Sequence, residues 1–171
     1  MRTHGWWAMT AARRTANEIC KDVASVLALP GLHSFTRRMV VYQAIWDWSE
    51  LNGKYNNPDF HWSPKALAWQ QSKRGDRKGI RREHVLPMTV TIEHILSLPK
   101  PREDDLAKLF RDASLICVVT VEEERQLNKN YRSRMPEGWK WRTGKKLWAR
   151  YEAVGIEHQR QHTHEHAAAA A

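Results

Sequence analysis

The sequence predicts a mostly helical α+β fold with a small β element. Apolar residues recur at helical spacing in several segments of the 171 residues. The segment 114–119 (SLICVV) is apolar and β-branched, which indicates a strand. Hydrophobic residues make up 42% and charged residues 27% of the chain, the balance of a folded globular protein. At this length we expect one globular domain over residues 11–156.

The predicted helices begin and end at residues that favour helix termini. Pro30 and Gly31 end the first helix, and Ser34 is predicted to cap the second. Ser63 and Pro64 are typical of the N-cap and first position of a helix. The predicted helices cover 11–29, 34–51, 63–71, 89–98, 103–113 and 145–154, with a further helix that begins at 120.

The two ends of the chain are predicted to lie outside the domain. Residues 1–10 read as a flexible arm, and residues 157–171, which contain several histidines and five alanines, read as a disordered tail. No apolar run approaches the ~18 residues of a membrane span, and no secretory signal is evident. Cys20 and Cys117 cannot form a disulfide framework or a CxxC zinc site. We therefore expect a cytoplasmic protein without a membrane partner.

The charge of the chain favours nucleic acid as a partner. Lysine and arginine number 28 against 19 acidic residues, a formal charge of +9. Basic residues concentrate in a predicted loop, 73–82, and in the stretch 129–150, where Trp139, Trp141 and Trp148 are interleaved. These tryptophans either stack on bases or cover the core. The candidate nucleic-acid-binding residues are Lys73, Arg74, Arg77, Lys78, Arg81, Arg82, Arg132, Arg134, Lys140 and Arg142.

Glu83 and His84 form an adjacent carboxylate and imidazole at the edge of the basic loop. Such a carboxylate can bind a divalent cation, and such an imidazole can deprotonate a water molecule near neutral pH. This pair is suited to phosphodiester hydrolysis. The alternative is a histidine at the end of an element that makes an ordinary surface hydrogen bond.

A second group of oxygen donors follows about forty residues later. Glu124 and Asn128 are four residues apart on the helix that begins at 120, so they share one helical face. Together with Glu83 they could complete a site for a hard cation. The alternative is that 122–124 is a solvated acidic first turn, which the helix dipole favours.

The order of these features resembles the HNH, or ββα-metal, nuclease module. The segment 83–87 (EHVLP) matches the opening of that module, and 119–128 (VTVEEERQLN) matches its strand and returning helix. The resemblance implies that His84 is the general base and Glu83 a metal ligand. It implies that Glu124, or less readily Glu123, is the helix ligand, with Asn128 one turn later.

The resemblance covers residues ~80–130 and includes three departures. Glu124 stands where the module has histidine or asparagine, which favours Mg²⁺ or Mn²⁺ over Zn²⁺. The CxxC pairs of many members are absent, and the insert between the two halves is long and predicted to be helical. The resemblance thus implies a ββα-metal-like core over 73–130, between a helical part at 11–72 and a basic, tryptophan-rich part at 131–156.

These observations predict a divalent-metal-dependent endonuclease that hydrolyses phosphodiester bonds, with DNA favoured over RNA. The size and charge suit a phage, mobile-element or defence protein. Three alternatives stay open. The module is one that has kept its fold but lost cleavage, the chain is a non-catalytic nucleic-acid-binding protein, or it is a small basic adaptor or inhibitor of an acidic protein.

Overall fold

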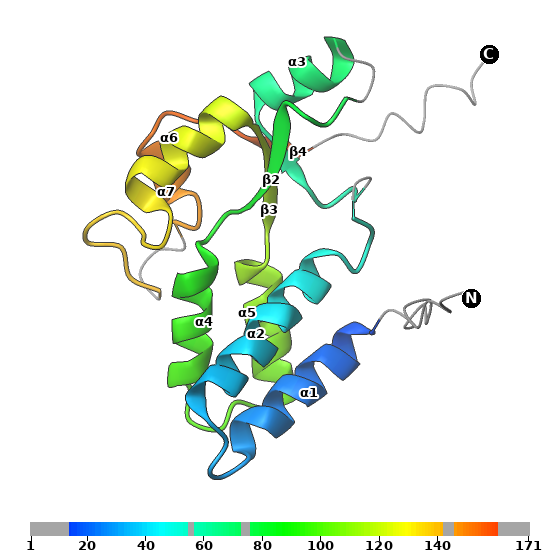
Figure 1. Cartoon of the computed structure of the whole chain (residues 1–171), viewed down its shortest axis with the longest axis vertical. Helices are drawn as coiled ribbons and strands as arrows, with labels where there is room; N and C mark the ends of the chain where they lie inside the picture. Colours follow the sequence, from blue (N-terminus) through cyan, green and yellow to red (C-terminus); the bar gives the residue numbers. More distant parts are fainter. Residues whose placement is uncertain (1–13, 55–56, 73–75, 142–145, 161–171) are drawn as a thin grey trace, which may run out of the picture.

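The computed structural model describes residues 14–54, 57–72, 76–141 and 146–160. These residues form helices and a small four-stranded sheet, so the predicted mostly helical α+β class is confirmed (Figure 1). The predicted arm at 1–10 and residues 161–171 of the predicted tail lie outside the described residues.

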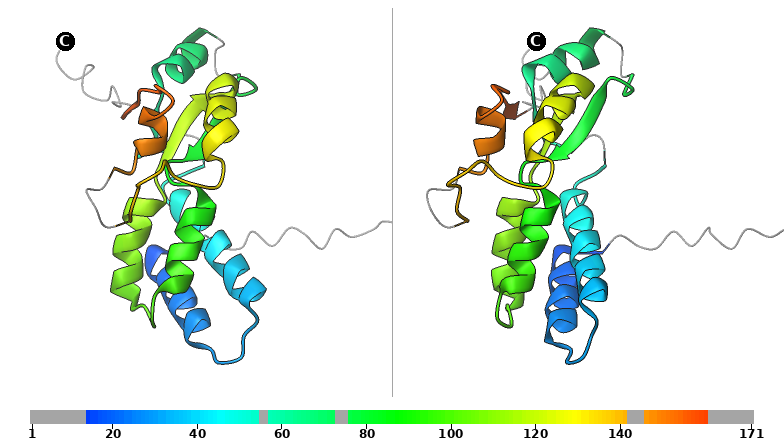
Figure 2. Two further views of the ribbon diagram at one scale, coloured as in Figure 1. Left: turned by 90° about the vertical axis from the view of Figure 1, so that its left-hand side faces the viewer. Right: turned by 60° about the vertical axis from the view of Figure 1, so that its left-hand side comes forward.

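Four helices form one half of the molecule, which we call the helical lobe. They are α1 (Ala16–Ala28), α2 (Ser34–Ser49), α4 (Met88–Ser97) and α5 (Glu103–Ala113). They lie together in the lower part of Figure 1, and both views of Figure 2 show them below the sheet. Their apolar faces meet in one core, which contains Ile19, Val23, Val41, Ile45, Ile92, Ile95, Leu106 and Phe110.

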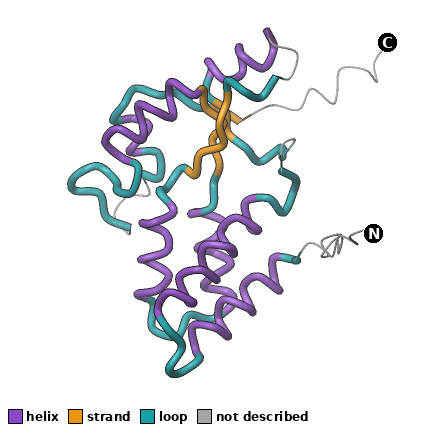
Figure 3. The backbone as a smooth tube through the Cα atoms, viewed as in Figure 1, coloured by secondary structure: helices purple, strands orange, loops and turns teal. Residues whose placement is uncertain are grey.

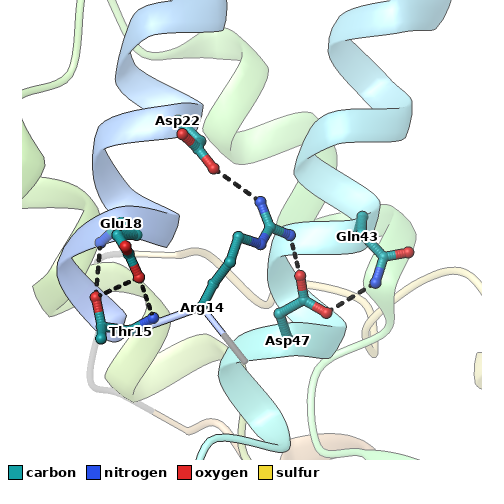
Figure 4. A network of polar contacts seen from close by, with 6 residues as sticks. All are labelled: Arg14, Thr15, Glu18, Asp22, Gln43 and Asp47. Carbon is teal, nitrogen blue, oxygen red and sulfur yellow. Dashed lines mark hydrogen bonds and ion pairs between the residues drawn. The ribbon is translucent and has the colours of Figure 1, made fainter. Parts of the chain in front are cut away.

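Arg14 links the start of α1 to α2. It forms ion pairs with Asp22 on α1 and with Asp47 on α2, and Gln43 donates a hydrogen bond to Asp47 (Figure 4). Thr15 caps α1 through a capping box with Glu18. These contacts fix the N-terminal end of α1 against the neighbouring helix.

The other half, which we call the sheet lobe, is built on a sheet of four short strands, drawn in orange in Figure 3. The order in the sheet is β2 (Ile80–His84), β3 (Ile116–Thr120), β1 (His61–Trp62) and β4 (Gln159–Arg160). Strand β3 pairs antiparallel with β2 and parallel with β1, whereas β4 pairs antiparallel with β1. Strand β3 is buried along its whole length because it has a strand on each side and helices over both faces.

Helix α3 (Pro64–Ser72) covers one face of the sheet, and α6 (Val121–Tyr131) and α7 (Ala149–Glu152) cover the other. Alternate residues of β3 therefore enter two different cores. Ile116 and Val118 pack with Phe60, Trp62 and Ala66, whereas Cys117 and Val119 pack with Val85, Leu127, Tyr151 and Ile156.

The helical lobe is discontinuous in sequence because α4 and α5 are inserted between the paired strands β2 and β3. The prediction of a helical insert is confirmed. The predicted division at residue 72 differs from the structure, since α3 packs on the sheet while the helical lobe takes α4 and α5. No helix in the described ranges has both the length and the apolar character needed to span a membrane.

Several predicted boundaries are wrong. Strand β2 begins inside the predicted loop 73–82, because Ile80 pairs with Thr120 of β3. His33, not Ser34, caps α2 by accepting a hydrogen bond from the Phe35 amide. The predicted final helix is reduced to the single turn of α7, and β4 occupies two residues of the predicted disordered tail.

Candidate active site

A pocket with a volume of about 450 Å³ lies where the helical lobe meets the sheet lobe, and we call it the junction pocket. It brings together the predicted base and the predicted metal ligands, which come from β2 and α6. Two predicted nucleic-acid-binding residues also line it. These lining residues are Glu83, His84, Glu124, Asn128, Arg82 and Arg132.

Strand pairing explains why residues about forty positions apart meet. Strand β2 ends at His84, which is paired with Ile116 at the start of β3. Strand β3 then runs directly into α6, whose first turn is held by a capping box between Thr120 and Glu123. Helix α6 therefore lies against the β2–β3 pair, and Glu124 and Asn128, which follow the capping box, line the pocket.

His84 is buried, and its side chain points towards α2. Its ring makes an edge contact with Trp46, with ring centroids 4.5 Å apart. Burial, together with the positive charges of Arg150 and Arg82, lowers the pKa of His84 to about 3. Its Nε2 atom has no hydrogen-bond partner among the described residues. The imidazole is therefore neutral at neutral pH and has a free lone pair or N–H at this atom.

Glu83 points the opposite way, towards α7, because successive strand residues face opposite sides. Its carboxylate lies 3.0 Å from a guanidinium nitrogen of Arg150. Burial raises the pKa of Glu83, the charge and hydrogen bond of Arg150 lower it, and the charge of Glu124 raises it further. Glu83 and Glu124 both line the junction pocket.

Arg150 is 1% exposed and holds the end of β2 in place. Besides Glu83, it donates to the carbonyl oxygens of Val85 at 2.9 Å and Tyr131 at 3.2 Å, and to that of His84. Four acceptors on a single buried guanidinium fix both the backbone and the carboxylate of the Glu83–His84 pair.

Glu124 and Glu123 have different roles on α6. Glu124 lines the pocket and forms an ion pair of 3.6 Å with Arg81. Glu123 is buried on another side of the helix, where it accepts hydrogen bonds from the Thr120 amide at 2.8 Å and from the Ser63 hydroxyl at 2.6 Å. The structure therefore favours Glu124 over Glu123 as the helix residue that faces the pocket.

The donor chemistry of the pocket suits a hard divalent cation. Two carboxylates and the Asn128 amide oxygen are ligands that Mg²⁺ and Mn²⁺ accept. In the arrangement seen here, each carboxylate is instead paired with an arginine. Within the described ranges, no three histidine, cysteine, aspartate or glutamate side chains are grouped so as to hold a metal ion. Metal binding would require Glu83 and Glu124 to exchange these partners.

Two of the predicted nucleic-acid-binding residues, Arg82 and Arg132, line the junction pocket. Arg82 contacts Glu50 at 2.6 Å, and Arg132 is exposed at the pocket rim. Lys73, Arg74 and Arg142 lie outside the described residues. The other predicted residues are exposed near the start of β2 or beyond α6, and they are Arg77, Lys78, Arg81, Arg134 and Lys140.

The C-terminal tryptophans pack on the protein. Trp139 and Trp141 lie against an apolar cluster at the junction of the lobes, and the Trp141 ring stacks on His94 at 3.9 Å. Trp148 stacks on His158 at 3.3 Å and also contacts His61. Of the two interpretations of these residues, the structure favours the one in which they cover the core.

The sequence analysis does not identify the two aromatic residues of the pocket, Tyr42 and Trp46, or its buried arginine, Arg150, as site residues. Arg150 had a recognisable signal, because it lies on the same helical face as Leu147, Tyr151 and Val154, where a charge must find partners. Tyr42 and Trp46 have no such signal in the sequence, because two aromatic residues four positions apart on a helix are equally typical of a buried core.

No protein-family model matches the chain, and no curated protein or solved structure matches it. The likeness to the HNH module therefore stays a prediction. It depends on residues ~80–130 and on the way the chain brings them together.

Proposed function

We propose that this protein is a divalent-metal-dependent endonuclease that hydrolyses phosphodiester bonds in DNA. One observation carries the proposal: His84, Glu83, Glu124 and Asn128 line a single pocket although they come from a strand and a helix far apart in sequence. The paired strands and the following helix that present them have the order of a ββα-metal module.

His84 would act as the general base. Its neutral imidazole has a buried Nε2 atom without a hydrogen-bond partner, and this atom would take a proton from an attacking water molecule once that water enters the site. Burial, and to a lesser degree the charges of Arg150 and Arg82, disfavours the protonated ring. A bound phosphodiester would bring negative charge beside these arginines and so offset their part of the lowering of the His84 pKa, which would make the imidazole a stronger base.

The other residues of the pocket would bind the metal ion and the DNA backbone and hold Glu83 in position. Glu83, Glu124 and Asn128 would hold one Mg²⁺ or Mn²⁺ ion, which neutralises charge on the phosphate and the leaving oxygen when bound. Arg82 and Arg132 would hold the sugar-phosphate backbone. Arg150 would keep Glu83 and the end of β2 in position.

The test is cleavage of supercoiled plasmid and of labelled single-stranded DNA in Mg²⁺, Mn²⁺ or EDTA by the full chain and by a His84→Ala variant. We expect the full chain to cleave at least one of these DNA forms in a metal-dependent manner, and His84→Ala to lose that cleavage while it retains DNA binding. His94→Ala is the matched control, because His94 lies outside the junction pocket, and it should cut normally. Cleavage that persists in EDTA or in His84→Ala would contradict the proposal.

A second candidate is a nucleic-acid-binding protein that does not cut. The pairing of both pocket carboxylates with arginines favours it, because these pairs satisfy Glu83 and Glu124 without a cation. It predicts binding without cleavage in every metal. Affinity would then depend on Arg82 and Arg132 and would be unchanged in His84→Ala.

A further inference from the structure

Helix α2 gives the junction pocket an aromatic wall. Tyr42 and Trp46 are one helical turn apart and line the same pocket as Glu83 and His84. We propose that this wall stacks on the base of an unpaired nucleotide, so that the substrate is single-stranded DNA. This inference rests on the proposed function, because it names the form of DNA that the pocket takes.

The two aromatic residues differ in how they are held. The Trp46 ring is fixed between the edge contact with His84 and the Arg82 guanidinium, which lies 5.7 Å from the ring centroid. Tyr42 is 39% exposed at the opening of the pocket. Tyr42 therefore has ring surface available to a ligand, while Trp46 forms the rigid back of the wall.

The exposed apolar surface continues along α2 away from the pocket. Phe35 is 63% exposed and Met39 46% exposed, and with Tyr42 and Trp46 they follow a spacing of four, three and four residues. This spacing places all four on one helical face. The face runs for about 16 Å along the helix, which is longer than the distance between neighbouring bases.

The charges around this face indicate nucleic acid as its partner. The apolar face leads into a pocket whose charged residues are three arginines, Arg82, Arg132 and Arg150, against two carboxylates, Glu83 and Glu124, so that its balance is positive. A ligand that fits both features needs flat apolar groups joined to a regular series of anions. Bases and phosphates of a polynucleotide have this combination, and base–aromatic stacking adds to phosphate contacts in single-strand binding.

The position of the wall favours a single strand over a duplex. In a duplex, each base is stacked on its neighbours, so an aromatic side chain reaches a base face only after a step is unstacked. An unpaired base offers its face without that cost. Because the wall lies directly beside His84, the nucleotide that stacks on it would also place its phosphate near the candidate base.

The test measures binding by fluorescence anisotropy in EDTA, so that no cleavage can occur. One labelled DNA oligonucleotide is used as a single strand and as a duplex with its complement. We expect tighter binding of the single strand, and a loss of about tenfold in single-strand affinity for Tyr42→Ala. Tyr42→Phe should retain the affinity, and duplex binding should not change.

Leu29→Ala is the matched control, because Leu29 is 50% exposed but does not line the junction pocket. It should bind both forms as the unmodified chain does. Equal or tighter binding of the duplex would overturn the inference, as would a Tyr42→Ala variant that behaves like Leu29→Ala.

Since cleavage is absent from this assay, a protein that cuts duplex DNA through His84 but shows no effect of Tyr42 would contradict this inference alone. A protein that prefers single strands through Tyr42 but never cuts would contradict the nuclease proposal alone.

Discussion

Arg150 carries a full positive charge into the interior of the sheet lobe. Its guanidinium is compensated by the Glu83 carboxylate and by three backbone carbonyl oxygens, two of which belong to His84 and Val85. A buried charge of this kind is tolerated only while its partners are present, and the partners in turn lose their donor if it is removed. The residue thus couples the stability of the fold to the shape of the candidate site.

We predict that Arg150→Met lowers the free energy of unfolding by about 3–5 kcal/mol, because it leaves Glu83 buried without its countercharge. Urea denaturation followed by circular dichroism would measure the change. Arg134→Met is the control: Arg134 is exposed, and its loss should cost less than about 0.5 kcal/mol. Equal midpoints for the two variants would show that the Arg150 contacts contribute little to stability.

Among single residues, the sequence identified those whose chemistry is locally evident. Glu83 and His84 stand out as an adjacent pair, and Glu124 and Asn128 share a helical face, so their meeting in one pocket could be predicted. The residues that contact Glu83 and His84 could not be predicted from the sequence. Arg150 and Trp46 reach them from elements that are distant in sequence, and nothing in their local spacing indicates that meeting.

Helix α6 illustrates how an element positions the site. Its capping box joins Thr120 to Glu123, and Glu123 also accepts a hydrogen bond from Ser63 at the start of α3. The box is buried between the sheet and two helices. Its geometry therefore sets the angle at which α6 leaves β3, and with it the direction in which Glu124 and Asn128 face.

We predict that Thr120→Ala destabilises the protein by about 1–2 kcal/mol, since a buried cap loses its side-chain acceptor. Thr15→Ala is a matched control, because Thr15 caps α1 through the same capping box in an exposed position. Its cost should lie nearer 0.5 kcal/mol. Thermal unfolding of both variants would measure the difference, and a larger loss for Thr15→Ala would contradict this account.

Elements were predictable where a local signal marks them. The caps at Ser63 and Thr120 and the apolar run of β3 are visible in the sequence and appear in the structure. Strands β1 and β4 have two residues each, too few for any periodic pattern, and they form because β1 adds to the sheet beside β3 and β4 adds beside β1. The short final helix reflects tertiary packing that overrides the apolar spacing of 145–154.

At the scale of the whole molecule, the net charge of +9 predicts that any binding of a polyanion weakens as the salt concentration rises. We predict that the logarithm of the DNA association constant falls linearly with the logarithm of salt concentration. Arg132→Ala should reduce the slope by about one, because Arg132 lies at the rim of the junction pocket. Arg111→Ala, a change on α5 away from that pocket, should leave the slope unchanged. DNA titrations at several salt concentrations would measure the slope for each variant. Equal slopes for the two variants would show that Arg132 does not contact a DNA phosphate.

The insertion of α4 and α5 between β2 and β3 has a consequence for how the chain folds during synthesis. Helices α1 and α2 leave the ribosome early, but the core that buries Ile19 and Ile45 is completed by Ile92 and Phe110. At typical translation speeds, this delay is on the order of 10 s. During that interval α1 and α2 can pack on each other but not on α4 and α5, so part of the apolar surface of the nascent helices stays exposed to water.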